Sequence, residues 1–310
     1  MQPDRTLTGI ALMLGFCVTA PLIDVASKLA AVSIPVGQVT TARFIVQAGL
    51  MLPLCLWLGY GLRLATGTRG QLALRALFLI LSTYCFVAAI QVMPIADALA
   101  IAFVEPFILL ILGRLLFGDS VGPRRIGASI VGFCGALLVI QPSLVTFGLV
   151  ALYPLGTALF FALYMLVTRS LSARMHPVPM QYHTASIATL MCLPVMFLAN
   201  GSGIGPLDPI WPQGIYWLWL AGVGSASAGA HMLMTYALRY APSATLAPLH
   251  YLEIVSAAAL GYVIFSDFPN ALTWTGIGVI VGSGLYIIHR ERLTARDIRN
   301  AAALNLAAPR

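Results

Sequence analysis

Apolar residues occupy the chain in long runs of about 20 positions, interrupted by short groups of proline, glycine and charged residues. A helix of that length crosses the roughly 30 Å hydrocarbon core of a bilayer. The runs lack the alternation of apolar and polar positions that a transmembrane β-barrel needs. The pattern therefore predicts an all-α integral membrane protein with ten transmembrane helices, at residues 7–28, 36–59, 71–92, 95–117, 124–141, 149–170, 181–199, 214–238, 242–266 and 272–289.

The composition excludes a soluble enzyme. Charged residues make up 9% of the 310 residues and hydrophobic residues 60%, whereas a soluble domain carries about 25% charged residues. The net charge of +7 does not indicate a nucleic-acid partner, because basic residues in a membrane protein mark its cytoplasmic face. The lipid bilayer and a small molecule are the partners we expect.

The basic residues also predict an orientation. With both termini in the cytoplasm, the cytoplasmic segments hold all but two of the 17 Lys and Arg residues, Arg75 among them. Lys28 falls outside, and Arg43 lies within the second span. One span more or fewer would invert every later loop and destroy this bias, so the bias supports ten spans.

The second half of the sequence repeats the first at an offset of 148 residues. The matching pairs are Pro94/Pro242, Ala96/Ala244, Glu105/Glu253, Gly113/Gly261, Phe117/Phe265 and Asp119/Asp267. Each half has five spans, an odd number, so the halves 1–142 and 143–290 should insert in opposite orientations around a central cavity, followed by a cytoplasmic tail at 291–310. Inverted repeats of this kind are a transporter architecture with the substrate near the midplane.

The end of the fourth span carries a Pro-x(6)-Gly-x(3)-Phe-x-Asp motif, from Pro106 to Asp119. With ten spans and a five-plus-five repeat, the chain resembles the drug/metabolite transporter superfamily in its ten-helix EamA-like branch. Two features depart from that pattern: the terminal acid is Asp rather than Glu, and Ile254 replaces the second proline, with Pro248 six residues earlier. The resemblance implies metabolite export across a bacterial inner membrane, and favours the neutral and aromatic amino-acid exporters.

Glu105 and Glu253 are the leading candidates for chemistry. Each lies eleven residues beyond a turn proline, about 17 Å along a helix and near the middle of the bilayer. An intramembrane acid is costly and suggests function, as a contact for a substrate amine or as a proton relay. The alternative is a neutral acid that only bonds a neighbouring helix.

A second set of charged residues lies towards the outer face. Asp24 and Lys28 are four residues apart, a spacing that predicts an ion pair on one helix face. Together with Arg43 and Asp97 they could form an outer gate of ion pairs. The alternative is interfacial snorkelling and helix stapling, in which the charged heads reach the membrane surface.

Three further groups complete the candidate site. His231 and His250 titrate near neutral pH and could couple a proton, although a buried histidine can also be simply hydrogen-bonded. The aromatic residues Tyr84, Phe103 and Tyr251 could line the cavity. Pro106 and Pro248 are candidate hinges. The five cysteines have no metal-binding spacing, so we expect no metal, disulfide or cofactor.

We therefore predict a secondary or facilitated exporter of small amphiphilic metabolites, chiefly neutral or aromatic amino acids, that works by alternating access. No ATP-binding motif is present. Spans 3, 4, 8 and 9 should enclose the cavity with help from spans 1 and 6, and a homodimer is possible through spans 5 and 10. A transporter of sugars, nucleotide sugars or drug-like compounds remains the alternative, ahead of a membrane scaffold, a channel or an intramembrane enzyme.

Overall fold

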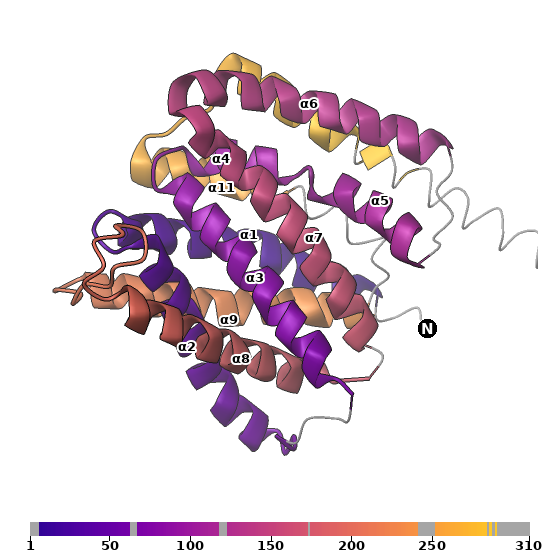
Figure 1. Ribbon diagram of the computed structural model, residues 1–310. Coiled ribbons are helices and arrows are strands. Elements are labelled where there is room, and N and C mark those ends of the chain that lie inside the picture. The colour runs from indigo at the N-terminus through magenta and orange to yellow at the C-terminus, as the bar shows by residue number, and fades with distance from the viewer. Residues whose placement is uncertain are drawn as a thin grey trace, which may run out of the picture.

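The computed structural model describes residues 6–62, 67–117, 123–172, 174–240, 252–283, 285–286 and 289, and this part of the chain is helical with no strand. Figure 1 shows the helices, most of them running roughly alongside one another. They are α1 (Thr6–Ala31), α2 (Val36–Trp57), α3 (Arg69–Ile90), α4 (Ile95–Ala102), α5 (Glu105–Phe117), α6 (Pro123–Phe147), the 3-10 helix η2 (Gly148–Leu152), α7 (Tyr153–Ser172), α8 (Pro177–Ala199), α9 (Tyr216–Tyr240) and α11 (Glu253–Phe265). A further apolar helix covers Ala271–Ser283.

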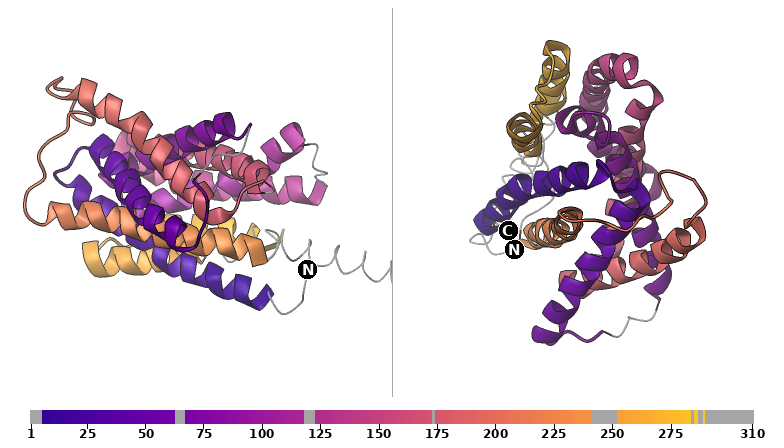
Figure 2. Two further views of the ribbon diagram at one scale, coloured as in Figure 1. Left: turned by 90° about the horizontal axis from the view of Figure 1, so that it is seen from below. Right: turned by 90° about the vertical axis from the view of Figure 1, so that its left-hand side faces the viewer.

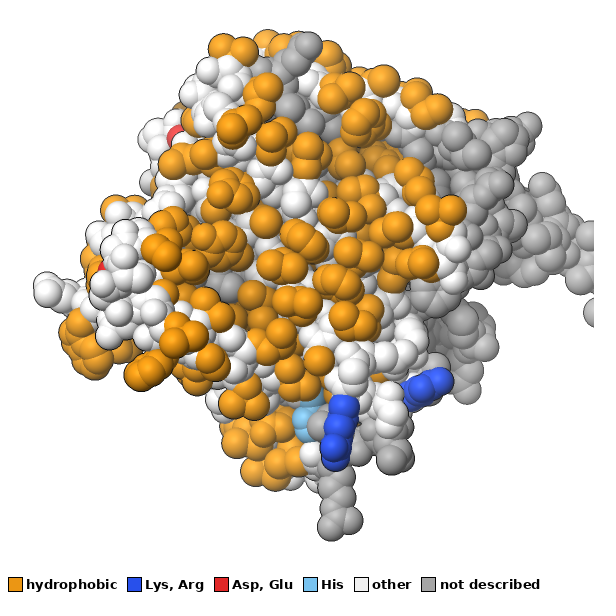
Figure 3. Space-filling view, in the orientation of Figure 1, with side chains coloured by type: hydrophobic (Ala, Val, Ile, Leu, Met, Phe, Trp, Pro, Cys, Tyr) orange, Lys and Arg blue, Asp and Glu red, His pale blue; other side chains and the backbone are white. Residues whose placement is uncertain are grey.

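In the part of the chain that the structure describes, five helical segments are long and apolar enough to cross a membrane: Leu7–Ala31, Val36–Trp57, Arg69–Ile90, Ser143–Thr168 and Pro177–Ala199. Large apolar side chains also cover the outer surface, where Trp57, Val145 and Phe197 are at least 80% exposed. Figure 3 shows hydrophobic side chains over most of the visible face. Such a surface needs a lipid environment, which fits a membrane-embedded protein with several spans.

The predicted fourth span is not one continuous helix. It divides into α4, which ends at Ala102, and α5, which begins at Glu105. Proline at position 106 explains the break, because proline supplies no N–H to bond the backbone carbonyl four residues earlier, here that of Ala102. The break places Glu105 at the start of a helix.

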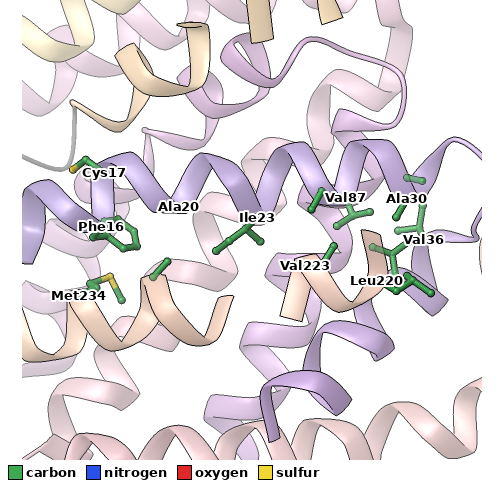
Figure 4. Packing of buried hydrophobic residues seen from close by; sticks show 14 of the residues in the cluster. Phe16, Cys17, Ala20, Ile23, Ala30, Val36, Val87, Leu220, Val223 and Met234 are labelled. Atoms are coloured by element: carbon green, nitrogen blue, oxygen red, sulfur yellow. The ribbon is translucent and has the colours of Figure 1, made fainter. Parts of the chain in front are cut away.

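The core forms where helices from the two halves of the sequence pack together. α1 lies against α9, and α3 lies against α7; Figure 2 shows α1 and α9 side by side in both views. Figure 4 shows Phe16, Ile23 and other apolar residues of α1 facing Val223 and Met234 of α9. At Gly224 of α9, α2 comes so close that an added Cβ would lie 2.4 Å from Val46.

The polar loop at residues 200–213, between α8 and α9, is held in place by hydrogen bonds. The Asp208 carboxylate accepts from the backbone N–H groups of Gly201 and Gly203, at 2.7 and 3.1 Å. Both glycines have φ near +74°, which favours glycine. Gln38 at the start of α2 exchanges two bonds with the backbone of Ile210, so the loop is fastened to the first half of the chain.

Candidate functional site

A cavity lies at the centre of the molecule, where α1, α2, α3, α4, α5, α7, α9 and α11 meet. It holds about 740 Å³ of space between side chains, counted with its opening. The predicted enclosing spans all contribute, and α2 joins them through Arg43. The lining residues are Phe16, Ala20, Ile23, Asp24, Arg43, Leu79, Ser82, Thr83, Phe86, Leu99, Ala102, Phe103, Glu105, Thr157, Ala158, Phe161, His231 and Glu253.

Arg43 is the cationic group of this lining. Its side chain leaves α2 and is 7% exposed. One terminal nitrogen donates to Thr83 Oγ1 at 2.7 Å, and the other lies 2.9 Å from His231 Nε2. The guanidinium therefore connects α2 with α3 and α9 in the cavity wall. Arg43 Nε and His231 Nδ1 have no hydrogen-bond partner, so each retains a polar atom that water or a solute could satisfy.

Three carboxyl groups share the cavity with this guanidinium. Asp24 comes from α1, Glu105 begins α5 and Glu253 begins α11, and all are at most 9% exposed. The two glutamates, 148 residues apart in the sequence, thus face one space. Among the lining residues that the structure describes, carboxyl groups outnumber guanidinium groups three to one, which favours a positively charged group on a bound solute.

The rest of the lining combines aromatic and hydroxyl side chains. Phe16, Phe86, Phe103 and Phe161 supply apolar surface. Thr157 of α7 and Ser82 of α3 bond each other's backbone carbonyls at 3.3–3.4 Å. The cavity is therefore suited to an amphiphilic solute with an apolar body and charged ends.

The predicted outer gate differs from its expected form. Lys28 Nζ bonds the Asp267 carboxylate at 2.8 Å and the Met93 carbonyl at 3.1 Å. The predicted Asp24–Lys28 ion pair is therefore wrong, because Asp24 points into the cavity and Lys28 reaches the end of α11. Asp97 is buried in α4 outside the cavity lining.

The remaining candidates lie in different places. Tyr84 packs beside the α1–α9 core and is not a lining residue, although its neighbours Ser82 and Thr83 are. Pro106 is the second residue of α5. His250, Tyr251 and Pro248 lie outside the described residues. Within the described part of the chain, no group of three His, Cys, Asp or Glu side chains could hold a metal ion.

The burial of one charged residue was missed from the sequence. We expected Arg75 in a cytoplasmic segment, but its side chain is 0% exposed inside α3, so Arg43 is not the only deep cation. Its position six residues into an apolar helix was the available signal.

Relatives of known function are transporters. The chain is 25% identical to an S-adenosylmethionine uptake transporter of Rickettsia prowazekii, over 92% of this chain and 94% of the relative. It is 25% identical to a riboflavin transporter of Brucella anthropi, over 92% and 99%. It is 26% identical to the pseudopaline exporter CntI of Pseudomonas aeruginosa, over 91% and 95%.

A solved structure matches this chain in fold, and a family model matches it in sequence. A solved crystal structure of a protein matches with a TM-score of 0.61 and 18% identity over 96% of this chain and 99% of that one, so the two share a fold. The model of the EamA-like transporter family matches twice, at residues 7–141 and 148–289. The chain therefore belongs to the EamA-like transporter family of the drug/metabolite transporter superfamily, and is a membrane transporter rather than an enzyme.

Proposed function

We propose that the protein exports small amphiphilic metabolites that carry both an amine and a carboxylate, with neutral and aromatic amino acids as the first candidates. The observation that carries this proposal is the lining of the cavity. Asp24, Glu105 and Glu253 would bind the ammonium group, Arg43 would bind the carboxylate, and the phenylalanines would hold the apolar side chain.

The proposed route is alternating access between two inverted five-helix repeats, residues 1–142 and 143–290, in ten transmembrane helices. Three observations support it: two matches to the family model, Glu105 and Glu253 each as the first residue of a helix, and the packing partners. α1 packs on α9 as α7 packs on α3, which is the pairing that exchange of the halves predicts. In this proposal the protein lies in a bacterial inner membrane, with both termini on the cytoplasmic side.

A proton gradient is the proposed energy source. The sequence has no ATP-binding motif, and the cavity holds three carboxyl groups and His231. One of these acids would bind a proton on one side of the membrane and release it on the other while the substrate moves in the opposite direction.

A second candidate is a metabolite with an additional positive charge. The excess of carboxyl groups over guanidinium in the cavity favours it, and relatives in Rickettsia are named as transporters of S-adenosylmethionine, which carries a sulfonium. In this case the three carboxyl groups of the cavity would balance two cationic groups of the solute.

The test is uptake of labelled solutes into proteoliposomes, with and without a pH gradient. The panel contains phenylalanine, leucine, lysine, S-adenosylmethionine and a sugar. We expect saturable uptake of phenylalanine or leucine that the gradient changes. Saturable uptake of S-adenosylmethionine alone would select the second candidate, and uptake of the sugar alone would contradict both.

Substitution of Glu105 or Glu253 should lower transport in the same assay, whereas substitution of an acidic residue outside the cavity should not. We expect Glu105→Gln and Glu253→Gln each to lower transport at least about ten-fold, because each substitution removes a charged contact to the solute or the proton. Asp208→Asn in the 200–213 loop is the control, and should transport like the parent protein. Normal transport by Glu105→Gln, with normal expression, would remove that residue from the mechanism.

A further inference from the structure

Arg75 lies in a second buried polar cluster, separate from the lining of the cavity. Its Nε donates to Thr168 Oγ1 at 2.8 Å, and one terminal nitrogen donates to the Tyr164 hydroxyl at 2.6 Å. The other terminal nitrogen donates to Thr184 Oγ1. The guanidinium carbon also lies 4.5 Å from the centre of the Tyr164 ring. Arg75 on α3 is thereby bound to two side chains of α7 and one of α8.

All the hydrogen-bond partners of this cation are neutral. Within the described residues no carboxylate forms an ion pair with Arg75. The ion pair found among those residues joins Lys28 to Asp267, at a different place in the molecule. A buried charge is costly unless a counter-charge balances it. Three hydroxyl groups could be bridged by a neutral donor at lower cost, so a structural role alone does not account for arginine at this position.

The cluster lies directly beneath one end of the central cavity. Leu79, one helical turn beyond Arg75 on α3, lines the cavity. Tyr164 stacks on Phe161 at 5.3 Å and meets the edge of His231 at 6.5 Å, between ring centroids. Phe161 and His231 are both lining residues. Tyr164 thus separates Arg75 from the cavity by a single layer of side chains.

The far side of the cluster is closed by apolar residues. Leu72, Leu171 and Met180 form a buried group next to it, each 0% exposed. They come from the same three helices, α3, α7 and α8. A separation of α3 from α7 and α8 would therefore open the apolar group and break the three bonds of Arg75 together.

We propose that Arg75 is the gate of the cavity at this end and, when the gate opens, a second carboxylate-binding residue. In the closed state the three hydroxyl groups satisfy its guanidinium. When α3 moves away from α7 and α8, the carboxylate of an entering solute replaces them, and the solute then passes Tyr164 to reach Arg43. This inference rests on the proposed function, whose topology places this end in the cytoplasm.

Gate opening can be measured by cysteine labelling without any transport assay. Met180→Cys is introduced after replacement of the five native cysteines, and a membrane-impermeant maleimide is added to inside-out vesicles. We expect Arg75→Gln to raise the labelling rate about ten-fold, because three hydrogen bonds to a charged group are lost. Arg69→Gln, at an exposed position on the same helix, is the matched control. Equal rates in the two variants would overturn the gate.

Thr184→Val tests the same gate if Arg75→Gln does not give monodisperse protein. It removes one hydroxyl and leaves the guanidinium in place. We expect faster labelling than in the parent, and an unchanged rate would overturn the gate.

The carboxylate contact is tested in the Thr184→Val background. Phenylacetate bound to Arg75 in the open gate should cover the cysteine of Met180→Cys and slow its labelling, whereas phenethylamine, which has the same ring but an amine, should not. Combining Thr184→Val with Arg75→Lys should keep part of the protection, because the charge remains. Equal protection by the two compounds would overturn the carboxylate contact.

The labelling experiment tests the gate and the uptake panel tests the proposed substrate, so each proposal can be contradicted without the other. If no amino acid is transported but Arg75 controls labelling, the proposed substrate is wrong and the gate stands. If phenylalanine is transported and labelling does not depend on Arg75, the gate is wrong and the proposed function stands.

Discussion

Arg43 joins three helices through one side chain, since its guanidinium on α2 bonds Thr83 on α3 and His231 on α9. It shares the cavity with Asp24, Glu105 and Glu253. The same group therefore fixes the cavity wall and offers a positive charge to a solute. This double role makes Arg43 the most informative single residue to change.

We expect Arg43→Gln to lower transport of a carboxylate-bearing solute about ten-fold or more, because a charged hydrogen bond contributes about 1.5–3 kcal/mol. The measurement is initial uptake into proteoliposomes at several substrate concentrations. Arg43→Lys keeps the positive charge but lacks the several N–H donors of the planar guanidinium. Its uptake rate should lie between those of the parent and Arg43→Gln. Unchanged uptake by Arg43→Gln would exclude a contact between Arg43 and the substrate carboxylate.

Single residues were predictable where a polar side chain lies within a membrane span, because placing a polar group in the bilayer core costs free energy. Arg43, Glu105, Glu253 and His231 stood out as polar groups within apolar runs, and the structure places them around one cavity. The partner of Lys28 was not predictable, because Asp267 lies 239 residues away and only the fold brings them together. The i, i+4 spacing suggested Asp24 instead, but it could not show that Asp24 faces inward.

At the scale of elements, close helix contact depends on small residues. Gly224 lets α9 approach α2, since an added Cβ would lie 2.4 Å from Val46 Cβ and 2.9 Å from the Arg43 carbonyl oxygen. Arg43 belongs to this contact, so the spacing of α2 and α9 also sets its reach to His231. A glycine permits close helix packing, but the sequence does not show which helix would be the neighbour.

Gly224→Ala should destabilise the protein by about 1–3 kcal/mol, because the methyl group forces α2 and α9 apart. Gly229→Ala is the matched control on the same helix, with nothing within 4 Å of its added Cβ. The Gly229→Ala variant should be as stable as the parent protein or more stable, because alanine has a higher helix propensity than glycine. Thermal unfolding in detergent measures both, and equal melting temperatures would contradict the close contact.

The broken fourth span shows what limits prediction of an element. Hydropathy measures apolar length, and residues 95–117 are apolar enough to read as a single span. The break follows from local backbone chemistry at Pro106 and Ala102. The proline was identified from the sequence as a hinge candidate, yet whether a proline bends or breaks a helix depends on the groups around it.

For the whole molecule, the proposed inverted repeat determines which loops share a side of the membrane. The sequence suggested this repeat through pairs of identical residues at a constant offset of 148. The structure adds matching partners, with α1 on α9 and α7 on α3.

Topology is tested by two single cysteines in a cysteine-free background. Ser120→Cys, between the predicted spans at 95–117 and 124–141, should react with an impermeant maleimide only from the cytoplasmic side. Phe268→Cys, at a position 65% exposed in the 266–271 loop, should react only from the outside. Labelling of both from the same side would refute the inverted repeat.

The fastened loop at 200–213 has a practical consequence for imaging. A protein of 33.0 kDa that is embedded in a detergent or lipid disc offers few external landmarks for aligning particles in cryo-electron microscopy. This loop is exposed, is fixed internally by Asp208, and is attached to α2 by Gln38. A nanobody raised against it would therefore form a rigid fiducial, whose orientation reports directly on that of the helices beneath.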